Sequence, residues 1–244
     1  WVLDIRNQNN VPLWMGESGE NSNLWFTDAI RLFEENEIGW AWWPWKKTES
    51  INSALSITSN SNFQSIVNYF ENGQNQPSID NAMLGLMQFS NDSRIENTKY
   101  NRDVIDAMMR QPHTNETVAY SDNVIPGVIH LTNYDLGLEQ YAYSDAVSGT
   151  YQVSTGEYTT WNNGWSYRND GVDIQVSTDN ESNGYHVGWV EEGEWLIYTV
   201  DVENSGFYDI VTRYSSEQAG GKISLLSNGL EITNQINLYN SGGY

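Results

Sequence analysis

The spacing of apolar residues changes near residue 120, and this change limits the folds that the chain can adopt. Before it, apolar residues recur every three or four positions, which is the period of an amphipathic helix. From about residue 125, short apolar runs alternate with clusters of Gly, Asn, Ser and Asp, a pattern typical of strands joined by turns. The 244 residues are therefore predicted to form two domains of different class.

The first 45 residues contain a strand, a helix and a second strand in close succession. Residues 11–17 predict a short buried strand, and Asn23 is placed to cap a helix over about 24–36. Residues 38–43 are too apolar for a strand with one solvent-exposed face, so they predict a strand buried on both faces. Such a strand–helix–strand unit indicates two parallel strands in a sheet covered by helices.

Three more helices are expected before the change in pattern. Ser78 and Asn101 are predicted caps, and Gly73 and Pro112 are predicted terminators. The apolar stripes of these helices are expected to face a core. The helices cover about residues 62–72, 78–90 and 101–110.

The second part of the chain predicts an antiparallel, jelly-roll-like β-sandwich over residues 125–244. The polar residues 113–124 are expected to form a linker between it and residues 1–112. The chain starts at Trp rather than Met and stops within the strand pattern, so both ends are expected to be truncations. The expected strands include Gly127–Leu131, Glu194–Val200, Phe207–Tyr214 and Lys222–Leu226.

The amino-acid composition of the chain limits the classes of ligand that it can bind. The net charge of −21 would repel a phosphate backbone, which argues against nucleic acid as a ligand. There is no Cys to form a disulfide or a Cys-based zinc site, and no apolar run of 18 residues to span a membrane. Aromatic residues make up 13% of the chain, including 11 Trp and 15 Tyr. Their rings combine an apolar face with a polar rim, which suits the surface of a sugar.

A carboxylate and a tryptophan cluster occupy the ends of the two predicted parallel strands. Glu17 ends the first strand and is followed by Ser18 and Gly19, and the second strand runs into the aromatic and basic segment 40–47. In parallel barrels, residues at the carboxyl ends of strands line the active site. A carboxylate that attacks the anomeric carbon, beside an aromatic wall that holds the sugar, is suited to glycoside hydrolysis.

These residues resemble glycoside hydrolase family 5, whose members are retaining (β/α)8 TIM barrels. The resemblance implies that Glu17 is the nucleophile, because the seventh strand of that family ends in a similar Gly-Glu-x-Gly motif. It implies that Trp43 stacks on the sugar, with Trp42 and Trp45 as alternatives, and that Lys46 reaches a substrate hydroxyl. Such enzymes require no cofactor.

The resemblance covers residues 1–112, which would be the last two βα units of a partial barrel. A retaining enzyme also needs a second carboxylate about 5–5.5 Å from the first, as general acid/base. In the family this is the Glu of an Asn-Glu pair that ends the fourth strand, and no position here corresponds to it. The chain alone is therefore expected to be inactive. The glutamates that follow the nucleophile, where the family does not place this group, are Glu20, Glu34, Glu35 and Glu37.

Two motifs in the second part, Val187-Gly188-Trp189 and Gly193-Glu194-Trp195, are similar to carbohydrate-binding module family 6. The resemblance covers residues 125–244, with the final strands absent. It implies that Trp189 forms one wall of a sugar cleft and that Tyr244 forms the other. Trp195 would belong either to a second cleft on the sheet face or to the core.

Many members of the module family bind a structural calcium through an acidic pattern, Glu/Gln-Ala-Glu, in the first strand. Here the corresponding residues are His130-Leu131-Thr132-Asn133, which lack that pattern. Whether a structural calcium is bound therefore stays open, and no residue is predicted to be its ligand. His130 is expected to be an ordinary strand residue. No metal-binding residue is predicted.

Together the two resemblances predict a fragment of a secreted, modular, retaining endo-β-glucanase, cellulase-like, with polysaccharide as its partner. The extracellular location follows from the polymeric substrate. A β-1,4-linked glucan is the expected substrate, and mannan, xyloglucan and mixed-linkage glucan remain alternatives. Two other classes stay open: a non-catalytic carbohydrate-binding protein with a degenerate barrel, and a structural or adhesion protein whose aromatic residues serve only packing.

Overall fold

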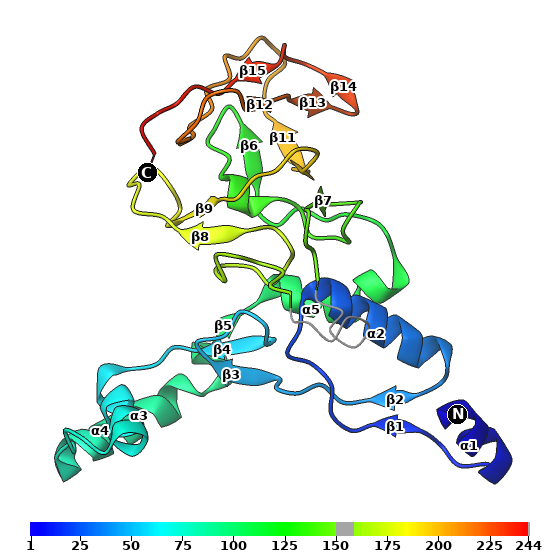
Figure 1. Ribbon diagram of the computed structural model, residues 1–244, viewed down its shortest axis with the longest axis vertical. Coiled ribbons are helices and arrows are strands. Elements are labelled where there is room, and N and C mark those ends of the chain that lie inside the picture. Colours follow the sequence, from blue (N-terminus) through cyan, green and yellow to red (C-terminus); the bar gives the residue numbers. More distant parts are fainter. Residues whose placement is uncertain (150–158, 244) are drawn as a thin grey trace. The chain divides into compact units, whose positions relative to one another are not determined.

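The computed structural model describes residues 1–149 and 159–243 of the chain. It divides into two compact units, Trp1–Glu203 and Asn204–Tyr244. The first contains all the helices of the described residues and most of the short strands, and the second contains short strands only (Figure 1). In the described part, no helix is both long and apolar enough to cross a membrane.

The predicted strand–helix–strand unit is present near the N-terminus, after a first helix, α1 (Val2–Asn9). Strand β1 (Trp14–Met15) pairs in parallel with β2 (Gly39–Trp40), and α2 (Asn23–Glu35) connects them. A Cβ at Gly39 would lie 2.3 Å from the Trp14 ring, so only glycine lets the two strands pack this closely. The parallel pairing that the sequence predicted is confirmed.

Helix α2 begins one residue earlier than predicted, and the expected cap is wrong. Ser22 is the N-cap, because its side chain accepts a hydrogen bond from the Trp25 backbone N–H at 3.2 Å. The Asn23 side chain is instead buried, and it donates to two carboxylates elsewhere in the unit. A short polar side chain at this helix end therefore serves long-range contacts rather than the local cap.

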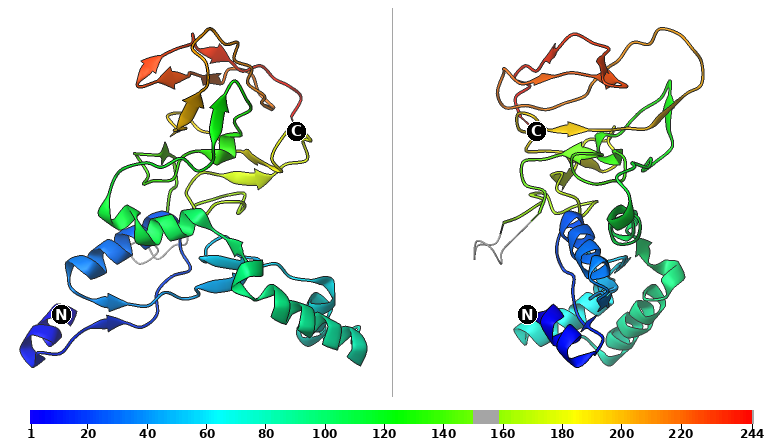
Figure 2. Two further views of the ribbon diagram at one scale, coloured as in Figure 1. Left: turned by 180° about the vertical axis from the view of Figure 1, so that it is seen from behind. Right: turned by 90° about the vertical axis from the view of Figure 1, so that its right-hand side faces the viewer.

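Helix α2 buries its apolar face against α5 (Arg102–Met109). Phe26 and Ile30 from α2 meet Val104 and Met108 from α5, and all four are essentially inaccessible to solvent. The two helices pack against each other (Figures 1 and 2). The Thr27 hydroxyl donates to the Ala107 carbonyl at 2.8 Å, which ties them together. At the start of α5, Asn101 occupies the N-cap position, but its amide bonds the carbonyls of residues 50 and 53 instead of the helix.

The segment of the sequence between α2 and α5 forms a small sheet and a helical hairpin. Strand β4 (Leu55–Ile57) pairs in parallel with β3 (Lys46–Thr48) and antiparallel with β5 (Lys99–Tyr100). Helices α3 (Ser61–Asn72) and α4 (Ile79–Asp92) then pack side by side. The single-turn 3-10 helices η1 (Ile95–Asn97) and η2 (Gln111–His113) precede and follow α5.

The caps of α3 and α4 follow from local sequence. The Asn60 and Ser78 side chains accept hydrogen bonds from the backbone N–H groups of Phe63 and Asn81. Gly73 ends α3 with a left-handed φ of 67°, as expected for a helix terminator. The predicted boundaries of both helices are confirmed to within one or two residues.

The apolar stripes of α3 and α4 are not buried, which corrects the expectation that they face a core. Phe63 and Phe89 stack on each other at 4.0 Å, and Gly85 allows the helices to approach closely. Beyond this contact, Phe70 and Ile79 are 80% and 82% exposed. No apolar side chain of these two helices is buried.

The remainder of the first unit, after α5, is rich in β-structure, as predicted, but its strands form several small sheets. Its core consists of buried residues near the 3-10 helix η3 (Leu131–Asn133) and the strands, namely Tyr134, Ala142, Tyr143, Val172 and Ile174. Among the described residues of this part, one strand pair is parallel and two are antiparallel, whereas a wholly antiparallel sandwich was expected. The pairs are β6 (Asn123–Ile125) with β11 (Val200–Val202), β7 (Tyr143–Ser144) with β10 (Trp195–Leu196), and β8 (Ile174–Val176) with β9 (Tyr185–Val187).

The predicted strand Gly127–Leu131 is wrong. The strand β6 lies before it and ends at Ile125, directly before Pro126, which has no N–H for a ladder. Leu131–Asn133 forms the 3-10 helix, with His130 at its N-cap position. His130 is therefore not the strand residue that the sequence predicted.

The second unit contains two short antiparallel pairs. Strand β12 (Lys222–Ile223) pairs with β15 (Ile236–Asn237), and β13 (Leu226–Ser227) pairs with β14 (Leu230–Glu231). The β13–β14 hairpin turns at Asn228-Gly229, both with positive φ, as the tightest hairpins require. The predicted strand Phe207–Tyr214 is wrong, since none of its residues pairs with another strand.

A buried polar network joins the helices of the first unit to its β-rich part. The Asn23 amide donates to Asp103 at 2.9 Å and to Asp170 at 2.7 Å. Arg168 forms an ion pair with Asp170 at 2.6 Å, and the Asn169 backbone N–H donates to Asp103 at 2.7 Å. The network spans the domain boundary predicted near residue 120, so residues on either side of that position contact each other within one unit.

Candidate functional site

The first candidate site is the loop after β1, which contains Glu17. The parallel pairing with the second strand continues past both strand ends, because Ala41 N donates to Met15 O at 2.9 Å and Trp43 N donates to Ser18 O at 2.7 Å. Glu17 is thereby placed next to the backbone of the tryptophan segment, with an exposed side chain. The sequence predicted that these two strand ends meet.

Gly19 shows how tightly the loop packs on the tryptophan segment. Its φ is 144°, and an added Cβ would lie 2.0 Å from the Trp43 carbonyl oxygen and 3.2 Å from the Trp42 indole nitrogen. Any other residue would push the loop away from the second strand. Gly19 is thus required for the loop after Glu17 to pack closely on the tryptophan segment.

The tryptophans of the cluster divide into packed and exposed members. Trp42 is half-buried and meets the Phe26 ring edge-on at 4.9 Å, so it covers the α2–α5 core. Trp43 and Trp45 are 57% and 43% exposed. Of the three predicted stacking residues, Trp43 and Trp45 therefore present rings that a ligand can reach, whereas Trp42 has a packing role.

The basic residues after the cluster have specific partners. The Lys46 ammonium donates to the Ser93 carbonyl at 2.5 Å, which joins β3 to the end of α4. Lys47 forms an ion pair with Glu20 at 2.5 Å. Glu34 lies 3.5 Å from His113 and accepts from the Trp40 indole at 3.3 Å. Glu20 and Glu34 are thus each engaged with other side chains.

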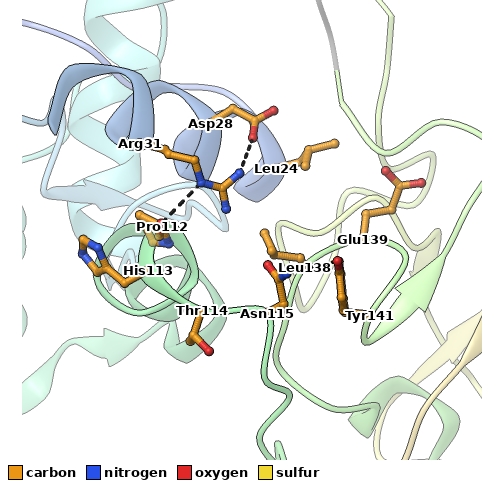
Figure 3. Close-up of a pocket in the computed structure, with 10 residues that line it drawn as sticks. All are labelled: Leu24, Asp28, Arg31, Pro112, His113, Thr114, Asn115, Leu138, Glu139 and Tyr141. Carbon is orange, nitrogen blue, oxygen red and sulfur yellow. Dashed lines mark hydrogen bonds and ion pairs between the residues drawn. The ribbon is translucent and has the colours of Figure 1, made fainter. Parts of the chain in front are cut away.

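A groove of about 570 Å³ lies elsewhere on the first unit, and none of the predicted site residues lines it. Figure 3 shows Arg31 and Asp28 of α2 on one wall and Tyr141 on the other. Arg31 contacts Asp28 at 3.6 Å and donates to the Pro112 carbonyl at 3.3 Å, while Asn115 donates to the Tyr141 hydroxyl at 3.0 Å. Sequence reasoning missed this groove because its walls come from distant segments without a shared motif.

The second candidate site lies in the β-rich part, where Trp189 follows strand β9. Trp189 is 49% exposed, and the N–H of the preceding Gly188 donates to the Asp173 carbonyl at 2.9 Å. Trp195 lies in β10 opposite Ser144 and is 36% exposed, so its ring is not part of the buried core. Tyr244, the predicted opposing wall, lies outside the described residues.

The surroundings of the buried network shift the pKa values of its ionisable groups. Burial raises the pKa of Asp103, the nearby Asp170 raises it further, and Arg168 opposes the shift. The Arg168 guanidinium also lies 3.6 Å from the centre of the Tyr134 ring, and burial raises the pKa of that phenol. Arg168 is completely enclosed by protein, so the cluster has no opening for a substrate and its role is structural.

The sequence predicted no metal-binding residue and left open whether a structural calcium is bound. Within residues 1–149 and 159–243, no three His, Cys, Asp or Glu side chains come together in a way that would hold an ion. In the segment where the module family places calcium ligands, Thr132 is buried and exchanges hydrogen bonds with Asn183 instead.

Comparison with known proteins identifies one part of the chain. Residues 163–244 match the family model described as Carbohydrate binding module (family 6). No curated protein and no solved structure matches the chain. The match confirms the predicted resemblance to that module for these residues and indicates carbohydrate binding. The resemblance of residues 1–112 to a glycoside hydrolase stays a prediction.

Proposed function

We propose that this chain is part of a secreted, modular, retaining endo-β-glucanase, in which a polysaccharide-binding module accompanies a catalytic barrel. The observation that supports binding is the family match over residues 163–244. The observation that supports catalysis is the loop of the exposed Glu17, whose next residues, Ser18 and Gly19, contact the backbone of Trp43. The expected substrate is a β-1,4-linked glucan, with mannan, xyloglucan and mixed-linkage glucan as alternatives.

In this proposal Glu17 is the nucleophile of a double displacement. Its carboxylate attacks the anomeric carbon while the glycosidic bond breaks and the general acid protonates the departing sugar oxygen, which leaves a covalent glycosyl-enzyme. Water, deprotonated by the same residue acting as base, then displaces Glu17 with retention of configuration. Trp43 stacks on the sugar ring and orients it for attack. The general acid/base comes from a second carboxylate, for which this chain has no counterpart, so catalysis needs the complete barrel.

The module increases the concentration of the enzyme at its polymer. Once the module has bound a polysaccharide, the catalytic site stays close to that polymer, so its effective concentration there is raised without new contacts at the catalytic centre. Polymers of this size are degraded outside the cell, which is the reason for proposing secretion. The second candidate function, a non-catalytic carbohydrate-binding protein, is favoured by the match to a binding module without a match to a catalytic family.

Binding is tested by electrophoresis of the full 244-residue chain in native gels that contain barley mixed-linkage glucan, xyloglucan, glucomannan or xylan. We expect at least one polymer to retard the protein, and Trp189→Ala to reduce the retardation without changing the melting temperature. Trp1→Ala is the matched control, because Trp1 is an exposed tryptophan outside the matched residues. Equal mobility of the parent chain in all four gels would exclude the proposed binding.

Catalysis is tested on the full-length product of the gene. A 2-deoxy-2-fluoro-cellobioside with a good leaving group should trap the glycosyl-enzyme, and mass spectrometry should place the label on Glu17. Glu17→Ala should lower kcat by several orders of magnitude, while binding to the polysaccharide gels stays unchanged. A protein that binds the gels but shows neither hydrolysis nor label would be the non-catalytic alternative.

A further inference from the structure

Two exposed tryptophans in the β-rich part share an unusual backbone conformation. Trp165 and Trp189 both have a φ of 46°, in the left-handed region that bulky residues rarely adopt. Their side chains are 42% and 49% exposed, so burial compensates little for the strain. Glycine or asparagine would fit either position more easily. Strained residues of this kind concentrate at functional sites, where the side chain itself is needed.

Asp173 holds the backbones of both tryptophan segments. Its buried carboxylate accepts hydrogen bonds from the Asn163 backbone N–H at 2.6 Å and from the Asn163 amide at 2.7 Å. Its backbone carbonyl accepts from Gly188 N at 2.9 Å. The loop before Trp165 and the turn before Trp189 are thus fixed to the same residue.

The two segments lie on opposite edges of strand β8. Ile174 is the partner of Val187 in β9, and the Trp189 turn continues from β9. On the other edge, Ile174 N donates to the Asn162 side chain at 3.4 Å, and a Cβ at Gly164 would lie 1.8 Å from the Ile174 carbonyl. Since neighbouring strands are about 4.8 Å apart, the two backbones are separated by about 10 Å across β8.

Trp165 is also held rigidly. Asn162, which is completely buried, accepts from Trp165 N at 2.8 Å and donates to the Arg168 carbonyl at 3.0 Å. The Trp165 ring meets the buried Trp161 ring edge-on at 4.9 Å, with an interplanar angle of 66°. A ring that is fixed before binding loses little conformational freedom when a ligand stacks on it.

We propose that Trp165 is a second sugar-stacking residue, which acts with Trp189 to hold one oligosaccharide across the start of β8. The separation of the two segments exceeds the width of a single sugar ring, so the ligand is a polysaccharide segment of at least two units. The inference rests on the proposed carbohydrate binding and adds a residue to that site that neither the sequence motifs nor the family resemblance assigned.

The test compares four variants of the full chain in the same native polysaccharide gels. We expect Trp165→Ala and Trp189→Ala each to weaken binding about three- to tenfold, the effect of losing one aromatic contact. Trp165→Tyr should keep most of the affinity, because a phenol ring also stacks. Trp165→Gly should bind as weakly as Trp165→Ala. Its melting temperature should be higher than that of Trp165→Ala, since glycine relieves the strained φ.

Two results would overturn the inference, and they differ in what they leave standing. If Trp189→Ala weakens binding and Trp165→Ala does not, the carbohydrate site exists but Trp165 is not part of it. If the parent chain is not retarded in any of the four gels, both this inference and the proposed binding fail. Trp1→Ala again controls for the loss of an exposed indole.

Discussion

The helix pairs α2–α5 and α3–α4 have similar apolar stripes in the sequence, but the structure uses them differently. In α2–α5, Phe26, Ile30 and Met108 are enclosed by protein on all sides. In α3–α4, the Phe63 and Phe89 rings stack on each other, but Phe70 is 80% exposed. The comparison teaches that helical periodicity identifies the apolar face but not whether another element covers it.

Polar contacts show the same difference. The N-terminal ends of α2 and α5 place Asn23 and Asp103 in the buried network with residues 168–170. The N-terminal ends of α3 and α4 are capped by Asn60 and Ser78, and neither side chain takes part in the buried network. Helices α2 and α5 are therefore tied to the β-rich part by apolar and polar contacts, whereas α3 and α4 contact mainly each other.

The largest expected effect is the loss of a buried ring from the first pair. Phe26→Ala should lower the free energy of unfolding by about 3–5 kcal/mol, because it leaves a cavity between α2 and α5. Urea denaturation followed by tryptophan fluorescence measures this. Leu32→Ala, an exposed position on the same helix, is the control and should cost little. Equal losses for both variants would mean that the face assigned as buried is not the packed one.

A smaller, pH-dependent effect is expected from Asp103→Asn in the polar network. Because burial and Asp170 raise the pKa of Asp103 in the folded state, the folded protein binds its proton more tightly than the unfolded chain does. Stability therefore falls as pH rises from about 4, the pKa of an unfolded aspartate, through the raised pKa. Asn keeps an oxygen acceptor and cannot ionise.

The melting temperature of Asp103→Asn relative to the parent should accordingly increase between pH 4 and pH 8. Thermal unfolding at one-unit pH intervals checks this, with Asp80→Asn on the exposed start of α4 as the control. A difference that does not change with pH would mean that Asp103 titrates in the folded protein as it does in the unfolded chain.

The smallest effect is expected from the second pair. Phe70→Ala should change the free energy of unfolding by less than about 0.5 kcal/mol, because the ring has few contacts to lose. The same urea denaturation measures it alongside Phe26→Ala. A loss as large as that of Phe26→Ala would show that another surface covers α3 and α4 in solution.

Helices were easier to predict than strands because their signals are local. Ser78 caps α4 and Gly73 ends α3 as the sequence indicated, since each bond or backbone angle involves neighbouring residues. The segments Gly127–Leu131 and Phe207–Tyr214 have strand-like composition but form no strand. A strand exists only if a distant segment supplies its partner, and composition does not report on that.

The candidate sites show the same limit. The position of Glu17 beside the tryptophan segment was predictable, because parallel strands joined by a helix bring their carboxyl ends to one edge. Trp165 gave no signal, since Trp161 and Trp165 lie in a polar segment that has no strand or helix periodicity. Its positive φ and the bonds from Asp173 to its loop are visible only in three dimensions.

By itself, the sequence determined helices α2 to α5, the cap of α4, the glycine that ends α3, the parallel β1–β2 unit and the motifs of the carbohydrate-binding module, because these depend on residues within a few positions or on short fixed spacings. Only the tertiary structure decided which apolar faces are covered, and that Asn23 and Asp103 join residues 168–170. It also decided which tryptophans stay exposed. These outcomes depend on contacts between segments up to 148 positions apart, for which the linear sequence has no corresponding pattern.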